Sequence, residues 1–426
     1  MEKIKIIVLC HVTPDRITHT TMLFQNILPI LKEKINVEII WAVLTSKVIK
    51  NYKISENERV IDLRNFNNFS EIIDNEKPDL VYAAATFSFI DYAASISAKS
   101  RKIPVLSRWY NPLDDNSGKQ NELIKSYAKR FFEKTIPSDE KNDSKIIMKR
   151  GRFFMYKYWF LMKTLKSIGI KLPRRFMISL KILNYFLNMG KKRVLPEFAN
   201  TMHWLENELV YNELYEGGYK KQSLVVTGNP MYDNAFKKIK NKTATKSEKI
   251  QILFAPIALF EHGLMTKEQN EFTFKTILQT INSEKNFDIK IKIHPTTQNL
   301  EYYQKLIQDI NESTPLIQNG HVLDYILESD ILITYIGNSS VHVNALISKK
   351  PVIVCNFFNK ESGTYANQNL VKECTNPKEL KKMIFENKIS QNENIDEFIT
   401  KYFYKNDGKA SERLCDVIIK MITHDK

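Results

Sequence analysis

Apolar and polar positions alternate over the first hundred residues as they do in a parallel sheet with helical connections. Nearly continuous apolar runs at Ile4–Cys10, Val37–Val43 and 104–109 predict buried strands. Amphipathic stretches at 20–34 and 89–99 predict helices between them. Because parallel strands need crossover connections, this order predicts an open parallel sheet with helices on both faces.

The second half of the chain repeats this pattern. Apolar runs predict strands at 224–227, 250–256, 289–293, 331–335 and 351–355. Longer amphipathic stretches predict helices at 266–282, 300–311 and 341–348. A chain of 426 residues is too long for one ordinary core. We therefore predict an α/β fold with two Rossmann-like parallel-sheet domains, over 1–222 and 223–394.

Two stretches beside this boundary are assigned differently. The acidic stretch 197–216 is helical in character, and the polar stretch 237–249 is expected to be a surface connection. In the first domain, residues 145–195 read as a helical basic insertion.

The insertion holds nearly all of the excess positive charge. The chain carries a formal net charge of +15, and 145–193 contains fourteen Lys or Arg and no Asp or Glu. A helix with apolar and cationic faces binds the interface of an anionic membrane. The candidate membrane-surface residues are Lys149, Arg150, Arg152, Lys157, Trp159 and Lys163. A helix that only packs between the domains and a nucleic-acid surface are the alternatives; the apolar content disfavours nucleic acid.

Other features of the sequence exclude several classes of protein. The cysteines Cys10, Cys355, Cys374 and Cys415 are scattered, which disfavours a disulfide framework or a zinc site. The N-terminal apolar run is too short for a signal peptide, and no apolar stretch of about twenty residues occurs. We expect a cytoplasmic protein, peripheral on the inner face of the membrane.

One loop of the second half has the chemistry of a phosphate site. Gly337 lets the backbone approach a ligand, and Asn338, Ser339 and Ser340 supply donors at the start of a predicted helix. Free N–H groups and the helix dipole favour an anion there. Helix capping alone is the alternative.

Three further loops follow predicted strands. His294, before Pro295, can donate a hydrogen bond to a phosphate or ribose oxygen. Gly228 and Asn229 are placed with it as donor-binding residues. The dipeptide 261–262 supplies Glu261 for substrate contact and His262 as a candidate catalytic group.

The loop after the first strand holds the candidate catalytic groups of the first domain. Asp15 or His11 can remove a proton from an acceptor hydroxyl. Arg16 and His19 can bind a phosphate or the substrate. A polar surface loop is the alternative. The two aspartates at 114–115 are rival candidates for the base. A solvated turn is the favoured interpretation of this pair.

Motifs of the second half resemble one branch of a known superfamily. They are Val-Thr-Gly-Asn-Pro at 226–230, Lys-Ile-His-Pro at 292–295 and the stretch 329–340 that ends in Gly-Asn-Ser-Ser, with support from 349–354 and 407–413. The chain resembles the GT-B superfamily. The branch holds non-hydrolysing UDP-N-acetylglucosamine 2-epimerases, bacterial capsule and lipopolysaccharide glycosyltransferases, and CDP-glycerol polyol-phosphate transferases.

This resemblance implies a GT-B fold with the donor nucleotide on the second domain and the acceptor on the first. It also implies that helices over 395–426 cross back to the first domain. The implied activity is an inverting glycosyltransferase that uses no metal or other cofactor; no DxD motif follows a predicted strand. It would move a sugar from a UDP- or CMP-linked donor to a glycan or lipid-linked acceptor in surface polysaccharide synthesis.

One departure bears on the alternatives. Relatives carry Glu a few residues into the helix after the glycine turn, where this chain has His342 and Asn344. This disfavours a nucleotide-sugar 2-epimerase. That epimerase, a CDP-polyol phosphotransferase and a non-catalytic nucleotide-sugar-binding module remain as alternatives.

Overall fold

The computed structural model describes most of the chain and divides it into two units. The described residues are 3–11, 13–15, 19–45, 49–83, 88–108, 150–187, 201–241, 247–295, 298–337, 339–387 and 393–423. The first unit comprises Met1–Asp233 and Tyr402–Lys426, and the second comprises Asn234–Lys401. Each unit is built on its own sheet.

The sheet of the first unit has the strand order β3-β4-β2-β1-β5-β6-β7-β8. Its described strands pair in parallel except for β3, which runs antiparallel to β4. They are β1 (Ile4–Cys10), β2 (Val37–Val43), β3 (Tyr52–Ser55), β4 (Glu58–Asp62), β5 (Leu80–Tyr82), β6 (Val105–Arg108), β7 (Thr201–Leu205) and β8 (Leu224–Val226). The order reverses between β1 and β5, so a switch point lies between their carboxyl ends.

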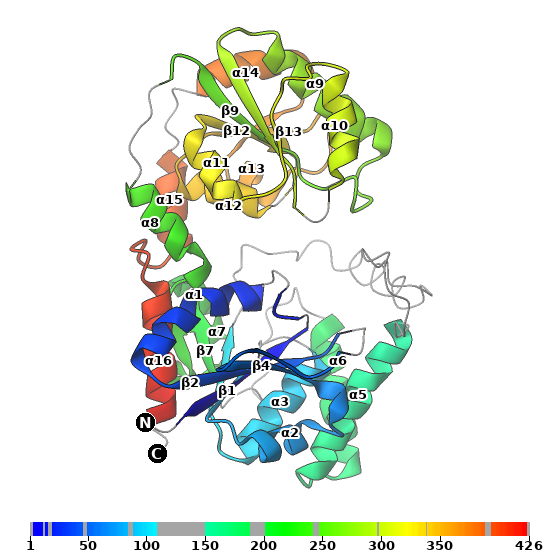
Figure 1. Cartoon of the computed structure of the whole chain (residues 1–426), viewed down its shortest axis with the longest axis vertical. Helices are drawn as coiled ribbons and strands as arrows, with labels where there is room; N and C mark the ends of the chain where they lie inside the picture. Colours follow the sequence, from blue (N-terminus) through cyan, green and yellow to red (C-terminus); the bar gives the residue numbers. More distant parts are fainter. Residues whose placement is uncertain are drawn as a thin grey trace. The chain divides into compact units, whose positions relative to one another are not determined.

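Helices cover both faces of this sheet (Figure 1). They are α1 (His19–Lys34), α2 (Phe69–Glu76), α3 (Phe89–Ser100), α5 (Arg150–Ser167), α6 (Leu172–Leu187), α7 (Glu208–Glu216) and α16 (Ala410–Thr423), with short 3-10 turns at Leu63–Asn65, Lys221–Ser223 and Pro230–Tyr232. On one face α1 packs with α16 through Phe24 and Leu414. On the other face α2, α3, α5 and α6 share a core that includes Phe69, Leu161 and Ile182.

The sheet of the second unit has the order β11-β10-β9-β12-β13-β14, and all its described pairs are parallel. The strands are β9 (Ile250–Ala255), β10 (Phe287–Lys292), β11 (Leu316–Ile317), β12 (Ile331–Tyr335), β13 (Val352–Cys355) and β14 (Lys372–Cys374). The apolar runs explain this sheet: β12 and β13 are buried along their whole length. The order reverses between β9 and β12, which places a second switch point there.

Helices again flank this sheet on both sides (Figure 1). They are α9 (Lys267–Asn282), α10 (Leu300–Gln308), α11 (Val322–Glu328), α12 (Ser340–Ile347), α13 (Thr364–Asn367) and α14 (Leu380–Asn387), with a 3-10 turn at Pro377–Glu379. Two more helices, α8 (Asp233–Asn241) and α15 (Glu393–Tyr402), stand at the ends of this unit's stretch of sequence. The start of α9 shows how local sequence sets a boundary. Thr266 and Gln269 form a reciprocal capping box, which satisfies two free N–H groups of the first turn.

The two-domain α/β architecture predicted from the sequence is confirmed, but three local assignments near the boundary are wrong. The stretch 197–216 is not all helical, because Thr201–Leu205 forms β7. The strand at 224–226 pairs with β7 in the first sheet, so it does not open the second domain. Part of the expected connection at 237–249 is helical, as the end of α8.

The described part of the basic insertion consists of α5 and α6. The inner face of α5 packs on α2 and α3 through Phe160, Leu161 and Leu165, which are buried. This insertion is therefore a structural part of the first unit. None of the helices in the described part of the chain combines the length and apolar character needed to span a bilayer.

Candidate functional site

Three loops of the second unit emerge from neighbouring strands of its sheet. They follow β10, β9 and β12, which lie side by side in that order. At the switch point, the Thr334 hydroxyl of β12 donates a hydrogen bond of 2.7 Å to the backbone oxygen of Ala255 in β9. The sheet order therefore brings together the loops that carry His262, His294 and Gly337.

His262 and His294 lie on two of these loops. The positive charges of Lys292 and His262 add to desolvation, the largest cause, and together they lower the pKa of His294 below its ordinary value. The two rings are thus close enough to interact electrostatically. A bound anion would favour the protonated form of His294, whose pKa burial and the neighbouring positive charges lower.

Lys292 and Gln298 hold the loop that presents His294. The ammonium group of Lys292 is buried and donates hydrogen bonds to the backbone oxygens of Ile293 and Gln318, at 2.9 and 2.8 Å. Burial lowers the pKa of Lys292. The side-chain oxygen of Gln298 accepts the backbone N–H of His294 at 2.6 Å. Both residues therefore position the loop through its backbone.

A chain of hydrogen bonds joins this loop to the loop after β9. The amide of Gln298 donates to the Tyr303 hydroxyl at 2.9 Å, and that hydroxyl donates to Oε1 of Glu261 at 3.0 Å. Burial, with the Glu261 carboxylate beside it, raises the pKa of Tyr303, so the hydroxyl remains a donor. Glu261 thus connects the two histidine loops and acts here as a positioning group.

The loop after β12 forms the turn expected from its sequence. Gly337 has a φ of +132°, a conformation that residues with a Cβ rarely adopt. The position where its Cβ would stand lies 3.8 Å from Ile257, so this turn approaches the loop after β9. Ser339 is the N-cap of α12 and accepts the N–H of Val341, while Ser340 is exposed. Asn338 lies outside the described residues.

Gly228 and Asn229 are not part of this edge, because they belong to the first unit. Gly228 has a φ of +81°, and a Cβ there would lie 3.1 Å from the backbone oxygen of Tyr404. The Asn229 side chain is mostly buried and accepts the N–H of Met231 as a cap. The structure therefore gives these two residues a packing role against 402–413.

In the first unit, a histidine and an aspartate meet at the switch point of the sheet. Nε2 of His11, after β1, lies 3.3 Å from Oδ2 of Asp91 in the first turn of α3. The Asp91 side chain is buried, whereas the His11 ring is exposed on its outer side. A buried carboxylate that holds an imidazole is a usual way to orient a general base.

The other candidate residues of the loop after β1 have fewer described contacts than His11. Asp15 is exposed, and its charge contributes, after burial, to a raised pKa of Tyr52. His19 is the first residue of α1, and its side chain is not described. Arg16 lies outside the described residues, as do both aspartates of 114–115 and Lys149.

Several residues of these sites carry no sequence signal. Asp91 reads as an ordinary acidic residue in the first turn of a helix. From the sequence, Tyr303 looks like a core position of α10. Gln298 looks like a surface position just before this helix. Within the part of the chain that the structure describes, no group of three or more His, Cys, Asp or Glu is arranged to hold a metal ion.

Comparisons with known structures define the class. Two parallel-sheet α/β units with polar groups at their switch points form the GT-B type of fold. Over 100% of its length the chain is similar to 98% of a Listeria monocytogenes protein described as a UDP-N-acetylglucosamine 2-epimerase, at 13% identity and a TM-score of 0.52. A second UDP-N-acetylglucosamine 2-epimerase gives 14% identity and 0.50, with 99% and 96% covered. The wall teichoic acid polymerase TagF gives 15% and 0.48, with 99% and 90% covered.

At these identities the structural likeness shows the fold alone, and the family follows from the sequence. Residues 190–420, more than half of the chain, match the family described as CDP-Glycerol:Poly(glycerophosphate) glycerophosphotransferase. The chain belongs to this family. No curated protein matches the chain significantly.

Proposed function

We propose that the chain transfers glycerol phosphate, or a related polyol phosphate, from a CDP-linked donor to a hydroxyl group of a growing surface polymer. The observation that supports this proposal is that the loops with His262 and His294 and the N-terminus of α12 follow three neighbouring strands of one sheet. Imidazoles and free backbone N–H groups both recognise phosphate oxygens. Membership of the glycerophosphotransferase family supports CDP-glycerol as the donor.

The reaction balances with the groups at hand. The acceptor oxygen forms a bond to the β-phosphorus of the donor, and the bond from that phosphorus to the bridging oxygen breaks, so CMP leaves. The acceptor proton goes to a base, for which we propose His11 because Asp91 orients its ring. His294 and the α12 N-terminus stabilise the negative charge on the departing phosphate.

Sugar transfer from a UDP- or CMP-linked donor, with inversion, is the second candidate. The GT-B type of fold is the observation in its favour. The loops described above recognise phosphates rather than the group attached to them, so either donor class suits them. For both candidates we propose a glycan or lipid-linked acceptor at the cytoplasmic face of the membrane, in surface polysaccharide synthesis.

A panel of donors tests the proposal. The full chain is incubated with CDP-glycerol, UDP-sugars and CMP-sugars, with and without a hydroxyl acceptor, and released nucleotide is followed by ³¹P NMR. CMP from CDP-glycerol is expected. Turnover of UDP- or CMP-sugars alone would favour the second candidate, and donor binding without turnover would reduce the chain to a binding module.

Two variants test the site itself. The double variant His294→Ala with Ser339→Ala is expected to lose at least tenfold in kcat/KM for the donor. The control Ser313→Ala removes a hydroxyl before β11, at the amino-terminal edge of the same sheet, and is expected to retain activity. Undiminished turnover in the double variant would remove the assigned phosphate site.

A further inference from the structure

Lys292, the last residue of β10, carries a buried charge. It is the only Lys or Arg that is buried among the residues that the structure describes, with 5% of its surface exposed. Its ammonium group donates hydrogen bonds to the backbone oxygens of Ile293 and Gln318, at 2.9 and 2.8 Å. Carbonyl oxygens satisfy these donors but carry no full charge. The positive charge of Lys292 is therefore hydrogen-bonded but not neutralised.

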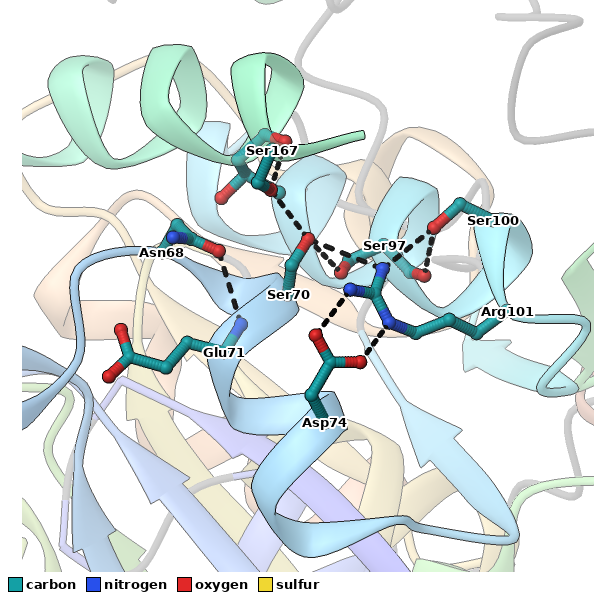
Figure 2. Close-up of polar contacts among 9 residues, drawn as sticks. Asn68, Ser70, Glu71, Asp74, Ser97, Ser100, Arg101 and Ser167 are labelled. Atoms are coloured by element: carbon teal, nitrogen blue, oxygen red, sulfur yellow. Dashed lines mark hydrogen bonds and ion pairs between the residues drawn. The ribbon is translucent and has the colours of Figure 1, made fainter. Parts of the chain in front are cut away.

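Two arginines of the first unit show how this chain otherwise neutralises a cation. Arg64, whose side chain is 10% exposed, is held by Asp62 at 2.8 Å. Figure 2 shows the second pair, in which Arg101 of α3 donates to Asp74 of α2 at 2.6 Å. Lys292 forms no ion pair with any Asp or Glu in the described part of the chain, and burial lowers its pKa. A buried charge without a counter-charge destabilises the folded state.

The titratable groups that interact with Lys292 do not supply the counter-charge. His294 on its own loop and His321 at the start of α11 are imidazoles. Desolvation is the largest cause of the lowered pKa of each ring, and the charge of Lys292 adds to it. Asp324 also acts on His321, but it is paired with Lys238. The surroundings of Lys292 therefore favour the arrival of a negative charge.

The N-terminus of α12 lies on the same face of the sheet as the Lys292 side chain. Lys290, two positions earlier on β10, pairs with Glu328 of α11 at 2.8 Å. Because alternate residues of a strand share a face, Lys292 also points to the face that α11 covers. Helix α12 packs against α11 (Figure 1). The free N–H groups at the start of α12 favour an anion on the side of the sheet where the buried ammonium lies.

We propose that Lys292 is a positioning residue for an anionic ligand, a diphosphate group, which supplies the negative charge that the folded chain does not. Lys292 acts through space and through the two carbonyls that it holds, without touching the ligand. The unliganded second unit carries the cost of the buried charge, and binding of the diphosphate removes part of that cost. The inference deepens the proposed function and rests on its diphosphate-linked donor.

A role confined to holding the loop explains less of what is observed. Gln298 already holds the backbone of His294 through a neutral side chain, at 2.6 Å. A neutral donor at position 292 could bond the oxygens of Ile293 and Gln318 without burying a charge. What the ammonium group adds is its charge, and a charge acts most strongly on a charged ligand. A phosphate-bearing ligand uses this feature, whereas a neutral polyol does not.

Binding of inorganic pyrophosphate to the full chain tests the inference without assuming a particular donor. Hydrogen exchange of peptides from β12 and α12 is measured at rising pyrophosphate concentration, for wild type and Lys292→Met. Pyrophosphate is expected to slow exchange in the wild type. Lys292→Met is expected to weaken pyrophosphate binding about tenfold and to reduce the dependence of the Kd on salt, because a charge has been removed from the site.

Two variants of neighbouring residues are matched controls. Lys290→Met removes a cation from the same face of the same strand, but one that Glu328 already neutralises, so it is expected to bind pyrophosphate like the wild type. Gln298→Ala loosens the same loop without changing its charge and is expected to keep the wild-type dependence on salt. If Lys292→Met does not fold, Lys292→Gln gives the same comparison, because its amide can still donate to one of the two carbonyls.

The pKa of His294, followed by NMR in the unliganded protein, is a readout that a purely structural role would not move. Removing the charge of Lys292 is expected to raise this pKa, and Lys290→Met is expected to leave it unchanged. An unchanged pKa in Lys292→Met would overturn the inference. Equal pyrophosphate binding in wild type and Lys292→Met, or equal loss in Lys290→Met, would overturn it as well.

The inference and the proposed function can fail separately. Binding of pyrophosphate that depends on Lys292, without turnover of CDP-glycerol, leaves the anion site and removes the proposed transfer. Turnover of CDP-glycerol that Lys292→Met retains in full removes the role of Lys292 and leaves the transferase.

Discussion

His342 predicts a dependence of stability on pH that belongs to the second unit alone. Its side chain is fully buried in α12, packs edge-on against Tyr365, and neither ring nitrogen has a hydrogen-bond partner among the described residues. Burial lowers the pKa of His342 from 6.5 to about 4. In the unfolded chain the ring is protonated as pH falls through 6.5, whereas in the folded unit it is protonated only near pH 4. Stability is therefore fully present above pH 6.5 and falls as pH drops towards about 4.

The size of this effect follows from the two pKa values. At about 1.4 kcal/mol for each pH unit, the gap limits the loss to about 3 kcal/mol, and at pH 5 about 2 kcal/mol of it has developed. Replacing His342 by Phe removes the titrating ring and keeps an aromatic side chain against Tyr365. At pH 7.5 the variant is expected to match or exceed the wild type, because a buried ring with unsatisfied nitrogens is lost.

The measurement is the unfolding free energy in urea at pH 7.5 and pH 5, for wild type and His342→Phe. The four tryptophans, at 41, 109, 159 and 204, all belong to the first unit. Their emission therefore follows that unit, while hydrogen exchange of α12 peptides follows the second. We expect the wild type to lose about 2 kcal/mol more than the variant in the exchange data, with no difference in the tryptophan data. Equal losses in the two proteins would show that His342 titrates normally and would refute the reasoning.

Three other predictions concern His294, Gly337 and Gly228. A bound phosphate favours the protonated form of His294, whose pKa the free protein lowers, so the Kd for CDP-glycerol should fall between pH 8 and pH 6; calorimetry should find this dependence absent in His294→Gln. Gly337→Ala forces a Cβ onto a backbone with a φ of +132°, which should cost the second unit about 1–3 kcal/mol by hydrogen exchange and weaken donor binding. Gly228→Val crowds the oxygen of Tyr404, so tryptophan-monitored stability should fall by about 1–3 kcal/mol while donor affinity is kept. Wild-type behaviour in any of these variants would contradict the geometry that motivates it.

The strands were largely predictable because a buried parallel strand is a continuous apolar run, as β1, β2 and β12 show. Periodicity does not say which strand pairs with which. For this reason the prediction that the strand at 224–227 opens the second domain is wrong, since β8 pairs with β7 in the first sheet. The short strand β7 was missed because five residues beside a longer helical stretch give too weak a period.

The candidate site was predictable where one residue type is unusual at a strand end, as with His294 and Gly337. The sequence does not show which of these residues lie close together in the folded chain. His262 and His294 are neighbours because β9 and β10 pair, and His11 meets Asp91 across about eighty positions of sequence. Supporting residues such as Gln298 act through the backbone of another loop, and no local pattern marks that role.

The position of α16 in the sequence affects the order in which the two units can fold during synthesis. Helix α16 completes the core of the first unit beside α1, and Asp233 accepts the N–H groups of Ala410 and Ser411 at its start. This helix leaves the ribosome only after every residue of the second unit has been synthesised. The second unit, built from a continuous stretch, can therefore finish folding first. Until translation delivers α16, the side of α1 that packs against it stays uncovered.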